Sequence, residues 1–249
     1  EELSRVQRRF VSDVSHELRT PLTTVRMASD VIHDTRTSFD PATARAAELL
    51  QTELDRFETL LTDLLEISRF DAGAAQLETE AVDVRDIVGG AVSAAEPLAQ
   101  SRGSRIDLDL PDAACVAACD SRRIERILRN LLSNAIEHGE GRPIEVRVAV
   151  GEAAVAVSVR DFGRGLDDGD LDRVFDRFWR ADPARARTLG GTGLGLSIAM
   201  EDTRLHGGRL AVWGRPGQGA LFRLTLPRVA GQALPNASPL PLDPTVVEV

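Results

Sequence analysis

Apolar positions in the first third of the chain recur at alternating spacings of three and four residues, the heptad pattern of packed α-helices. The first run comprises Val11, Val14, Leu18, Pro21, Val25, Ala28 and Ile32. Asp40 and Pro41 then supply a helix N-cap and a first-turn proline. The second run comprises Leu50, Leu54, Phe57, Leu61, Leu64 and Ser68. The spacing therefore predicts an antiparallel hairpin of two long helices within residues 1–71.

Each helix of such a hairpin carries one apolar seam, and no third helix is predicted to cover the two seams. Two seams cannot close a core alone, whereas two copies of the hairpin form a four-helix bundle. We therefore expect residues 1–71 to be a dimerisation domain and the protein to be a homodimer.

After residue 71 the pattern changes, because Asp71–Ala75 breaks the helical period and contains a glycine. Strand-like runs follow at Ile106–Leu110, Ile144–Val150, Val155–Val159, Arg209–Trp213 and Leu221–Leu226, with helical segments near 84–101, 120–138 and 193–206. This order predicts an α/β or α+β domain, so the whole chain is of the α plus α/β class. We assign residues 72–78 to a hinge, 79–228 to this second domain and 229–249 to a disordered proline-rich tail.

The charged composition excludes several classes of enzyme. The 249 residues include 30 basic and 39 acidic side chains, for a formal net charge of −9, and none of the basic residues is lysine. A P-loop, a eukaryotic-type protein kinase and a pyridoxal phosphate enzyme each need a lysine, so all three are excluded. The acidic balance argues against a nucleic-acid partner. Cys115 and Cys119 lie in an apolar stretch and are expected to be buried hydrophobic residues.

His16 is the first candidate for chemistry. With Val11 at heptad position a, His16 occupies the outer position f, beside Glu17 and one turn before Thr20. A solvated imidazole can act as a nucleophile or proton carrier, and Glu17 can orient the ring or accept its proton. Judged from this helix alone, a surface histidine without a function is the alternative.

A second candidate is the polar face of the helix predicted near 120–138. Asn130 and Asn134 lie one turn apart on that face. Two amide oxygens can bind Mg²⁺, which takes its remaining ligands from water and nucleotide phosphates. Two ordinary surface residues are the alternative.

Two segments containing glycine complete the candidates. Asp161 ends an apolar strand, where its carboxylate can accept a hydrogen bond from an exocyclic amino group such as that of adenine, and Gly163 and Gly165 permit close backbone approach. The glycine-rich segment Gly190–Ser197 leads directly into a helix, which favours phosphate binding by backbone N–H groups. The long polar stretch between residues 161 and 195 is expected to be a lid.

Together and in this order, these segments resemble the sequence boxes of two-component sensor histidine kinases. The H, N, G1, F and G2 boxes correspond to Phe10–Leu22, Asn130–His138, Asp161–Leu166, Val174–Arg180 and Gly191–Leu196. The resemblance covers residues 5–228. Three further stretches resemble one subgroup of that family, namely Thr23–Ala28, Glu53–Leu61 and Ser238–Pro241.

The resemblance implies a dimeric phosphotransfer hairpin followed by an α/β sandwich of the histidine kinase type, which holds ATP. It implies that His16 attacks the γ-phosphate and that the phosphoryl group then passes to an Asp of a response regulator. Glu17 is implied as the adjacent acid–base residue, and Thr20 as the residue that orients water when the regulator is dephosphorylated. The chain, which opens with Glu1, is expected to be the cytoplasmic portion of a plasma-membrane sensor whose N-terminal region is absent.

Within the ATP domain, the resemblance assigns Mg²⁺ to Asn134 with Asn130, and the adenine amino group to Asp161. The further nucleotide contacts that it implies are His138, Gly163, Gly165, Gly191, Thr192, Gly193, Leu194 and Gly195. Arg177 or Arg180 is expected to stabilise charge on the transferring phosphoryl group.

Glu137 departs from the family pattern, because N boxes commonly carry a basic residue at this position. A carboxylate there repels a triphosphate unless it is turned away or bridged through the metal, so we expect an arginine to compensate. The departure leaves open a dimeric scaffold that binds nucleotide without transferring phosphate. A related ATPase of the same sandwich fold, acting in protein folding or DNA repair, is a third hypothesis, against which the H box argues.

Overall fold

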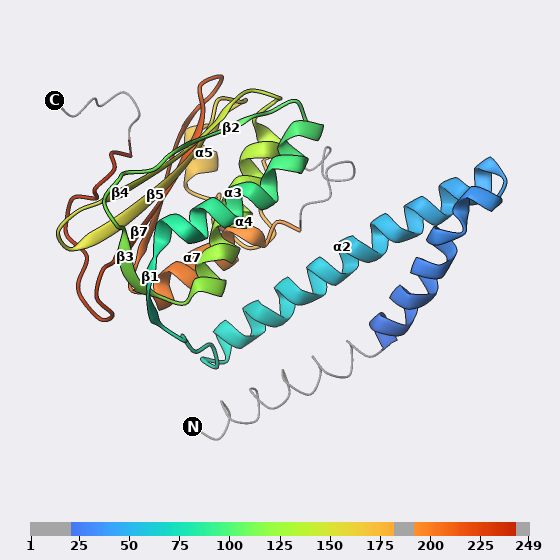
Figure 1. Ribbon diagram of the computed structural model, residues 1–249, viewed down its shortest axis with the longest axis horizontal. Coiled ribbons are helices and arrows are strands. Elements are labelled where there is room, and N and C mark those ends of the chain that lie inside the picture. Colours follow the sequence, from blue (N-terminus) through green and yellow to red (C-terminus); the bar gives the residue numbers. More distant parts are fainter. Residues whose placement is uncertain (1–20, 182–191, 243–249) are drawn as a thin grey trace. The chain divides into compact units, whose positions relative to one another are not determined.

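The computed structural model describes residues 21–181 and 192–242 (Figure 1). These residues separate into two compact units. The helical unit comprises described residues 21–75 and 192–194, and the α/β unit comprises residues 76–181 and 195–242. No helix in either described part is both long and apolar enough to cross a membrane.

The helical unit is the predicted hairpin. Residues 21–34 are helical, a short 3₁₀ turn η1 (Arg36–Ser38) follows, and α2 (Pro41–Asp71) is the return helix. Asp40 is the N-cap, as expected: its Oδ1 accepts hydrogen bonds from the backbone N–H groups of Ala42 and Thr43, at 3.0 and 3.2 Å. At 1.5 Å per residue α2 is about 46 Å long.

The apolar seam of α2 is only partly covered within the hairpin. Leu54 and Leu61 are half-buried, whereas the other three leucine and phenylalanine positions of the seam are exposed. Leu50, Phe57 and Leu64 are 42%, 53% and 45% exposed. This alternation is expected of a helix that packs one side of its seam on its hairpin partner and leaves the other side for the further helices of a bundle.

The α/β unit contains a five-stranded mixed sheet and a small two-stranded sheet. Its elements in chain order are β1 (Glu80–Asp83), α3 (Val84–Ser101), β2 (Ile106–Asp109), β3 (Val116–Cys119), α4 (Ser121–His138), β4 (Ile144–Val150), β5 (Ala154–Asp161), α5 (Asp168–Leu171), α7 (Gly195–Leu205), β6 (Arg209–Arg215) and β7 (Gly219–Pro227). The large sheet has the order β2-β4-β5-β7-β6; β2 and β4 are parallel and the other neighbours antiparallel. Strands β1 and β3 pair antiparallel. All five predicted strands and all three predicted helices are present, whereas β1, β3 and α5 were not predicted.

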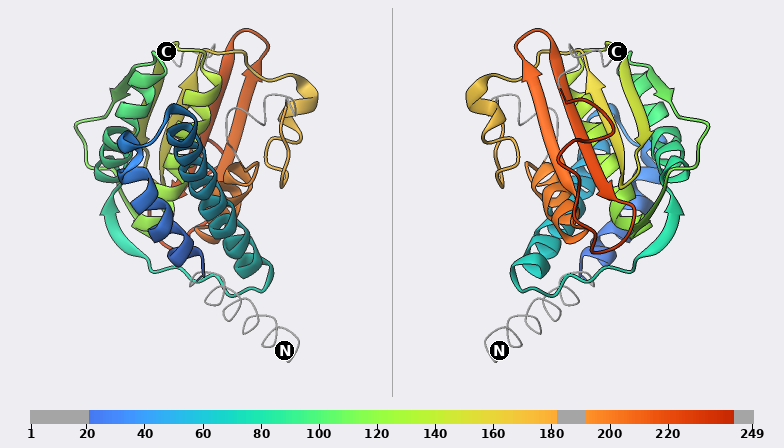
Figure 2. Two further views of the ribbon diagram at one scale, coloured as in Figure 1. Left: turned by 90° about the vertical axis from the view of Figure 1, so that its right-hand side faces the viewer. Right: turned by 90° about the vertical axis from the view of Figure 1, so that its left-hand side faces the viewer.

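The core lies between one face of the large sheet and the helices α3, α4 and α7 (Figure 2). Alternate residues of the central strands, such as Val157 and Leu224, point into it. Helix α4 contributes its entire apolar face, namely Ile124, Ile127, Leu128, Leu131 and Leu132, each at most 1% exposed. Cys115 and Cys119 are unbridged and fully buried, as expected, and burial raises the pKa of the Cys119 thiol to about 11.

The opposite face of the sheet is covered by the segment that we expected to be disordered. Residues 229–242 lie across this face (Figure 2, right). Ser238 Oγ is 2.9 Å from Thr225 Oγ1, and Arg223 Nη1 donates to the Leu240 carbonyl at 2.7 Å. The expectation of disorder is therefore wrong for residues 229–242, and residues 243–249 are not described. The tail lacks periodicity, which argues against a helix or strand but does not prevent it from packing on the face of a sheet.

Candidate functional site

The site is built around the polar face of α4. Asp120 is the N-cap of this helix, and its carboxylate accepts a hydrogen bond from the backbone N–H of Arg123 at 3.3 Å. Because the apolar face is buried in the core, Asn130, Asn134 and Glu137 share the remaining face at spacings of four and three residues. Helix α4 therefore presents two amides and one carboxylate in a row.

At its C-terminal end, α4 meets the turn that follows β5. Asp161, the last residue of β5, is 2% exposed, and its Oδ1 accepts a hydrogen bond from the backbone N–H of Gly163 at 2.9 Å. A Cβ on Gly163 would lie 1.9 Å from the His138 carbonyl oxygen at the end of α4. Only glycine permits this approach, so the Asp161 turn and the end of α4 form one surface.

The next turn residue is fixed by a second close approach. Gly165 has a φ of +75°, and a Cβ on it would lie 1.8 Å from the Arg215 carbonyl oxygen. Position 165 therefore requires glycine both for its backbone conformation and for the space available. Gly163 and Gly165 are two of the glycines that the family resemblance implies as nucleotide contacts.

Asp161 is a buried carboxylate supported by backbone donors. Burial raises its pKa, and hydrogen bonds from the backbone N–H groups of Gly163 and Ala220 partly oppose that shift. A carboxylate in this setting gains from a further hydrogen-bond donor, and the exocyclic amino group of a purine is one.

The glycine-rich segment reaches α4 from the other side. Asn130 Nδ2 donates to the Gly195 carbonyl at 2.8 Å, where α7 begins. Gly193 has a φ of +72° and Leu194 is fully buried. Thr192 belongs to the helical unit, in which its hydroxyl donates to Asp63 Oδ2 at 2.8 Å and accepts from the Leu194 N–H at 3.2 Å.

Glu137 faces an arginine from the loop after α5. Arg180 Nη2 is 3.8 Å from Glu137 Oε1, and the two side chains are 22% and 18% exposed. Burial raises the pKa of Glu137, and the charges of Arg180, Arg102 and Arg164 oppose this shift. An arginine therefore lies beside Glu137, and its compensation of this carboxylate toward a triphosphate stays a prediction. His138 is half-buried and Arg177 is exposed.

The donor set suits a magnesium ion that is bound together with phosphates. Asn130 uses its amide N–H₂ on Gly195, which leaves its oxygen as an acceptor. Within the described ranges, no group of three or more His, Cys, Asp or Glu side chains is arranged to hold a metal. Neutral amide oxygens fit Mg²⁺ only where water and substrate phosphates complete its shell.

Several candidates lie outside the part of the chain that the structure describes. They are His16, Glu17, Thr20 and Gly191. Among the described candidates, the structure brings together Asn130 with Gly195, Asp161 with Gly163 and the end of α4, and Arg180 with Glu137.

Two domain families match the chain. Residues 6–73 match the His Kinase A (phospho-acceptor) domain, and residues 119–230 match the histidine kinase-, DNA gyrase B- and HSP90-like ATPase. The first match contains His16, and the second contains the whole of α4, Asp161 and Gly195. This chain belongs to the sensor histidine kinases. The phospho-acceptor domain separates it from the ATPases of protein folding and DNA repair that share the sandwich.

Curated relatives match nearly the entire length of this chain. It is 57% identical over 244 residues to sensor histidine kinase MtrB of Mycobacterium tuberculosis, a match spanning 98% of this chain and 43% of the relative. It is 34% identical to sensor histidine kinase WalK of Bacillus subtilis over 91% of this chain and 38% of WalK. The chain thus spans less than half the length of the curated relatives that it matches.

Solved structures show the same fold. Full-length ShkA in complex with AMPPNP superposes with a TM-score of 0.77 at 26% identity, over 90% of this chain and 47% of ShkA. Acinetobacter baumannii histidine kinase AdeS superposes with a TM-score of 0.61 at 23% identity, over 86% of this chain and 98% of AdeS. The α plus α/β architecture predicted from the sequence is confirmed.

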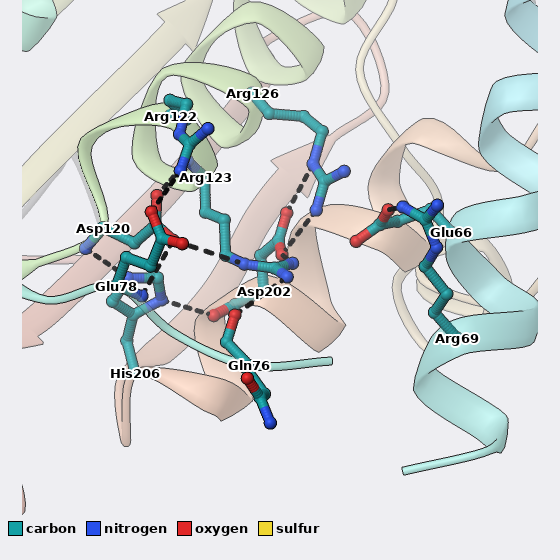
Figure 3. A network of polar contacts seen from close by, with 10 residues as sticks. All are labelled: Glu66, Arg69, Gln76, Glu78, Asp120, Arg122, Arg123, Arg126, Asp202 and His206. Carbon is teal, nitrogen blue, oxygen red and sulfur yellow. Dashed lines mark hydrogen bonds and ion pairs between the residues drawn. The ribbon is translucent and has the colours of Figure 1, made fainter. Parts of the chain in front are cut away.

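One polar cluster of the α/β unit was not predicted from the sequence. Asp202 of α7 is 0% exposed and binds Arg123 and Arg126 of α4 (Figure 3). A signal was present in the sequence, because Asp202 shares the inner face of α7 with Ile198 at a spacing of four residues. A charged residue on an apolar helix face requires a buried partner, and this inference was missed.

Proposed function

We propose that this chain is the kinase portion of a sensor that phosphorylates itself on His16 with ATP. An imidazole nitrogen of His16 forms a bond to the γ-phosphorus, the bond to the β-phosphate oxygen breaks, ADP leaves, and Glu17 accepts the imidazole proton. The phosphoryl group then passes to an aspartate of a response regulator. By its similarity to MtrB, the regulator is of the MtrA type.

The observation that carries the proposal is the convergence on α4. The Asp161 turn seats against the C-terminal end of this helix, and the start of α7 is bonded to Asn130 on the same helix. A nucleotide between these points would meet a buried acceptor for its base and a helix N-terminus for its phosphates. In this pose the two ends of ATP are bound by two different segments, both attached to α4.

Asn134 and Asn130 would hold Mg²⁺, which when bound neutralises phosphate charge. Gly163 and Gly165 shape the base pocket, and residues 191–195 contact the phosphates. His138, at the end of α4, is proposed to contact the nucleotide.

Arg180 is proposed to stabilise charge on the transferring phosphoryl group. Arg180 Nη2 lies 3.8 Å from Glu137 Oε1, which places a planar guanidinium group beside the polar face of α4. Arg177, three residues earlier and exposed, is the alternative for this role. Since transfer depends mainly on positioning and electrostatics, an arginine that acts on the transition state affects the rate more than the affinity.

The proposal extends to the assembly and its location. The exposed seam of α2 would be buried by a second copy of the hairpin in a homodimer. Thr20 would orient the water that dephosphorylates the regulator. The chain would lie on the cytoplasmic side of the plasma membrane, as part of a longer sensor.

Labelling with γ-³²P-ATP tests the proposed activity. We expect wild type to acquire a label that is acid-labile and alkali-stable, and His16→Gln to acquire none while it still binds ATP. ATP binding without label in wild type would favour the nucleotide-binding scaffold instead. Label that persists in His16→Gln would refute the assignment of the phosphoacceptor.

The role of Arg180 is tested by comparing rate with affinity. Arg180→Ala is expected to slow autophosphorylation about a hundredfold or more, while the ATP dissociation constant changes only a few-fold. Arg177→Ala is the matched control. Equal losses of rate and affinity in Arg180→Ala would refute the assignment. A selective loss of rate in Arg177→Ala would assign the role to Arg177 instead.

A further inference from the structure

Asp202 is a buried charge that accepts three hydrogen bonds from two arginines. Arg126 binds it in a fork, with Nε 2.8 Å from Oδ2 and Nη2 2.7 Å from Oδ1, and Arg123 Nη1 lies 2.8 Å from Oδ1 (Figure 3). The carboxylate is 0% exposed, and the arginine side chains are 16% and 20% exposed. Such a cluster costs desolvation energy, so its geometry is tightly determined.

The cluster is the middle of three attachments between α4 and α7. At the nucleotide end, Asn130 bonds to the carbonyl of Gly195. At the far end, His206 Nδ1 is 2.7 Å from the Asp202 carbonyl oxygen, and His206 Nε2 accepts the Asp120 backbone N–H at 3.1 Å. Because Nε2 is an acceptor, the ring carries its proton on Nδ1 and donates there. These contacts fix the axial register of the two helices.

The same cluster also binds the segment that leads into the α/β unit. Arg123 Nη2 donates to the Gln76 carbonyl at 3.1 Å, while Nη1 of the same guanidinium holds Asp202. The Glu78 backbone N–H donates to Asp120 Oδ2 at 3.2 Å. Residues 76–78 fall within the hinge predicted from the sequence. One planar group therefore contacts both the hinge and the helix that begins at the phosphate-binding segment.

We propose that Asp202, with Arg123 and Arg126, is a positioning residue for the reaction with ATP. Through the rigid fork of Arg123, docking of residues 76–78 sets the register of α7 against α4, and with it the position of Gly195 relative to Asn130. A shift of the hinge would move Arg123 and alter the shared carboxylate, so the hinge and the phosphate-binding end are coupled. The inference rests on the proposed function only in taking that end to be the ATP site.

The coupling is tested with Arg123→Met in the full chain, and Arg122→Met is the matched control. Both variants remove one arginine from the first turns of α4, and Asp202 keeps its fork to Arg126 in each. Arg122 is 78% exposed, and the ion pair that the structure gives it is with Glu78. Hydrogen exchange is followed at three places: the hinge, helix α7 and the strands β5 and β7.

In Arg123→Met, we expect exchange of both the hinge and α7 to accelerate about tenfold or more, the effect of losing a charge-assisted hydrogen bond. Strands β5 and β7 should change less than about twofold, and binding of a fluorescent ATP analogue should weaken about tenfold. Arg123→Lys, which keeps the charge but lacks the fork, should give an intermediate effect and is the second variant if Arg123→Met fails to fold. Arg122→Met should leave α7 and nucleotide affinity unchanged.

Two results would overturn the proposal. In the first, exchange accelerates in the hinge while exchange of α7 and nucleotide affinity stay unchanged. This result would show that the hinge and α7 are not coupled. Equal acceleration in β5 and β7 would show that the cluster only braces the whole unit. A wild type that binds no nucleotide would refute the proposed function alone, because exchange of α7 reports the coupling without nucleotide.

Discussion

Two buried carboxylates of the α/β unit, Asp161 and Asp202, are 2% and 0% exposed. Asp202 receives three N–H groups from two guanidinium groups. Asp161 is supported by backbone N–H groups, and burial raises its pKa. The fold therefore pairs Asp202 with its own cations, whereas the backbone groups that support Asp161 carry no charge. Burial alone does not mark a functional carboxylate, and the identity of its partners is the better guide.

The two ends of α4 differ in the same way as the two carboxylates. Its first turns carry Arg123 and Arg126, which are engaged with another helix of the fold. Its later turns carry Asn130 and Glu137, which contact Gly195 and Arg180. One helix therefore braces the fold at one end and carries the proposed nucleotide-binding face at the other.

The largest effect is expected from Asp202→Asn, which leaves two buried guanidinium groups without their carboxylate. The free energy of unfolding should fall by about 3–5 kcal/mol. Urea denaturation measures this loss. Glu201→Gln is the control on the neighbouring, half-exposed position, where loss of the ion pair with Arg204 should cost less than about 1 kcal/mol. Equal losses in the two variants would remove the distinction on which the comparison depends.

The outer face of the sheet is covered by the chain's own tail, which bonds to Arg223 and Thr225 on that face. Ending the chain after Arg228 would uncover Ala156, Ser158 and Thr225, which are now 0%, 5% and 3% exposed. We expect the free energy of unfolding to fall by about 2–3 kcal/mol, the contribution of one or two buried apolar side chains. Thermal unfolding of this truncation, against one that ends after residue 242, checks the value. Identical melting temperatures would mean that the tail contributes nothing to the sheet.

Asp83 is a third carboxylate of this unit, more exposed than Asp161 and Asp202 and, like Asp202, paired with an arginine. The hydrogen bond from the Arg85 side chain holds the pKa of Asp83 at about 2, below its ordinary value of 3.8. Because the folded-state pKa is lowered, this stabilisation is present above pH 3.8 and is lost as the pH falls through about 2. In urea titrations across that window, Asp83→Asn should lack this component of the acid loss. Asp86→Asn, on the same helix turn and exposed, should retain it.

The sequence predicted the elements that have strong periodicity and missed those that do not. The apolar alternation of β4, β5 and β7 and the amphipathic pattern of α4 are long enough to be recognised. Strands β1 and β3 have four residues each, and β3 reads Val116–Cys119 with two alanines, so neither has a strand signal of its own. Each strand is stabilised by pairing with the other, which local sequence does not encode.

The candidate site was predictable to the extent that its residues lie close together in sequence. Asn130 and Asn134 are one turn apart, and Asp161 and Gly163 share a turn, so each pair forms a local motif. The Asp202 cluster joins residues that are 76 and 79 positions apart. Arginine–carboxylate pairing over such separations has no sequence period, and only the packing of α7 against α4 reveals it.

The most direct test of the account is an ATP titration of Asp161→Asn, with its free energy of unfolding measured alongside. Asparagine keeps the shape of the side chain, while its N–H₂ group replaces an acceptor at the position assigned to the adenine amino group. We predict that ATP affinity falls about tenfold to a hundredfold and that stability changes by less than about 1 kcal/mol. Unchanged ATP affinity, or a loss of stability as large as that of Asp202→Asn, would contradict the claim that this carboxylate is left for a ligand.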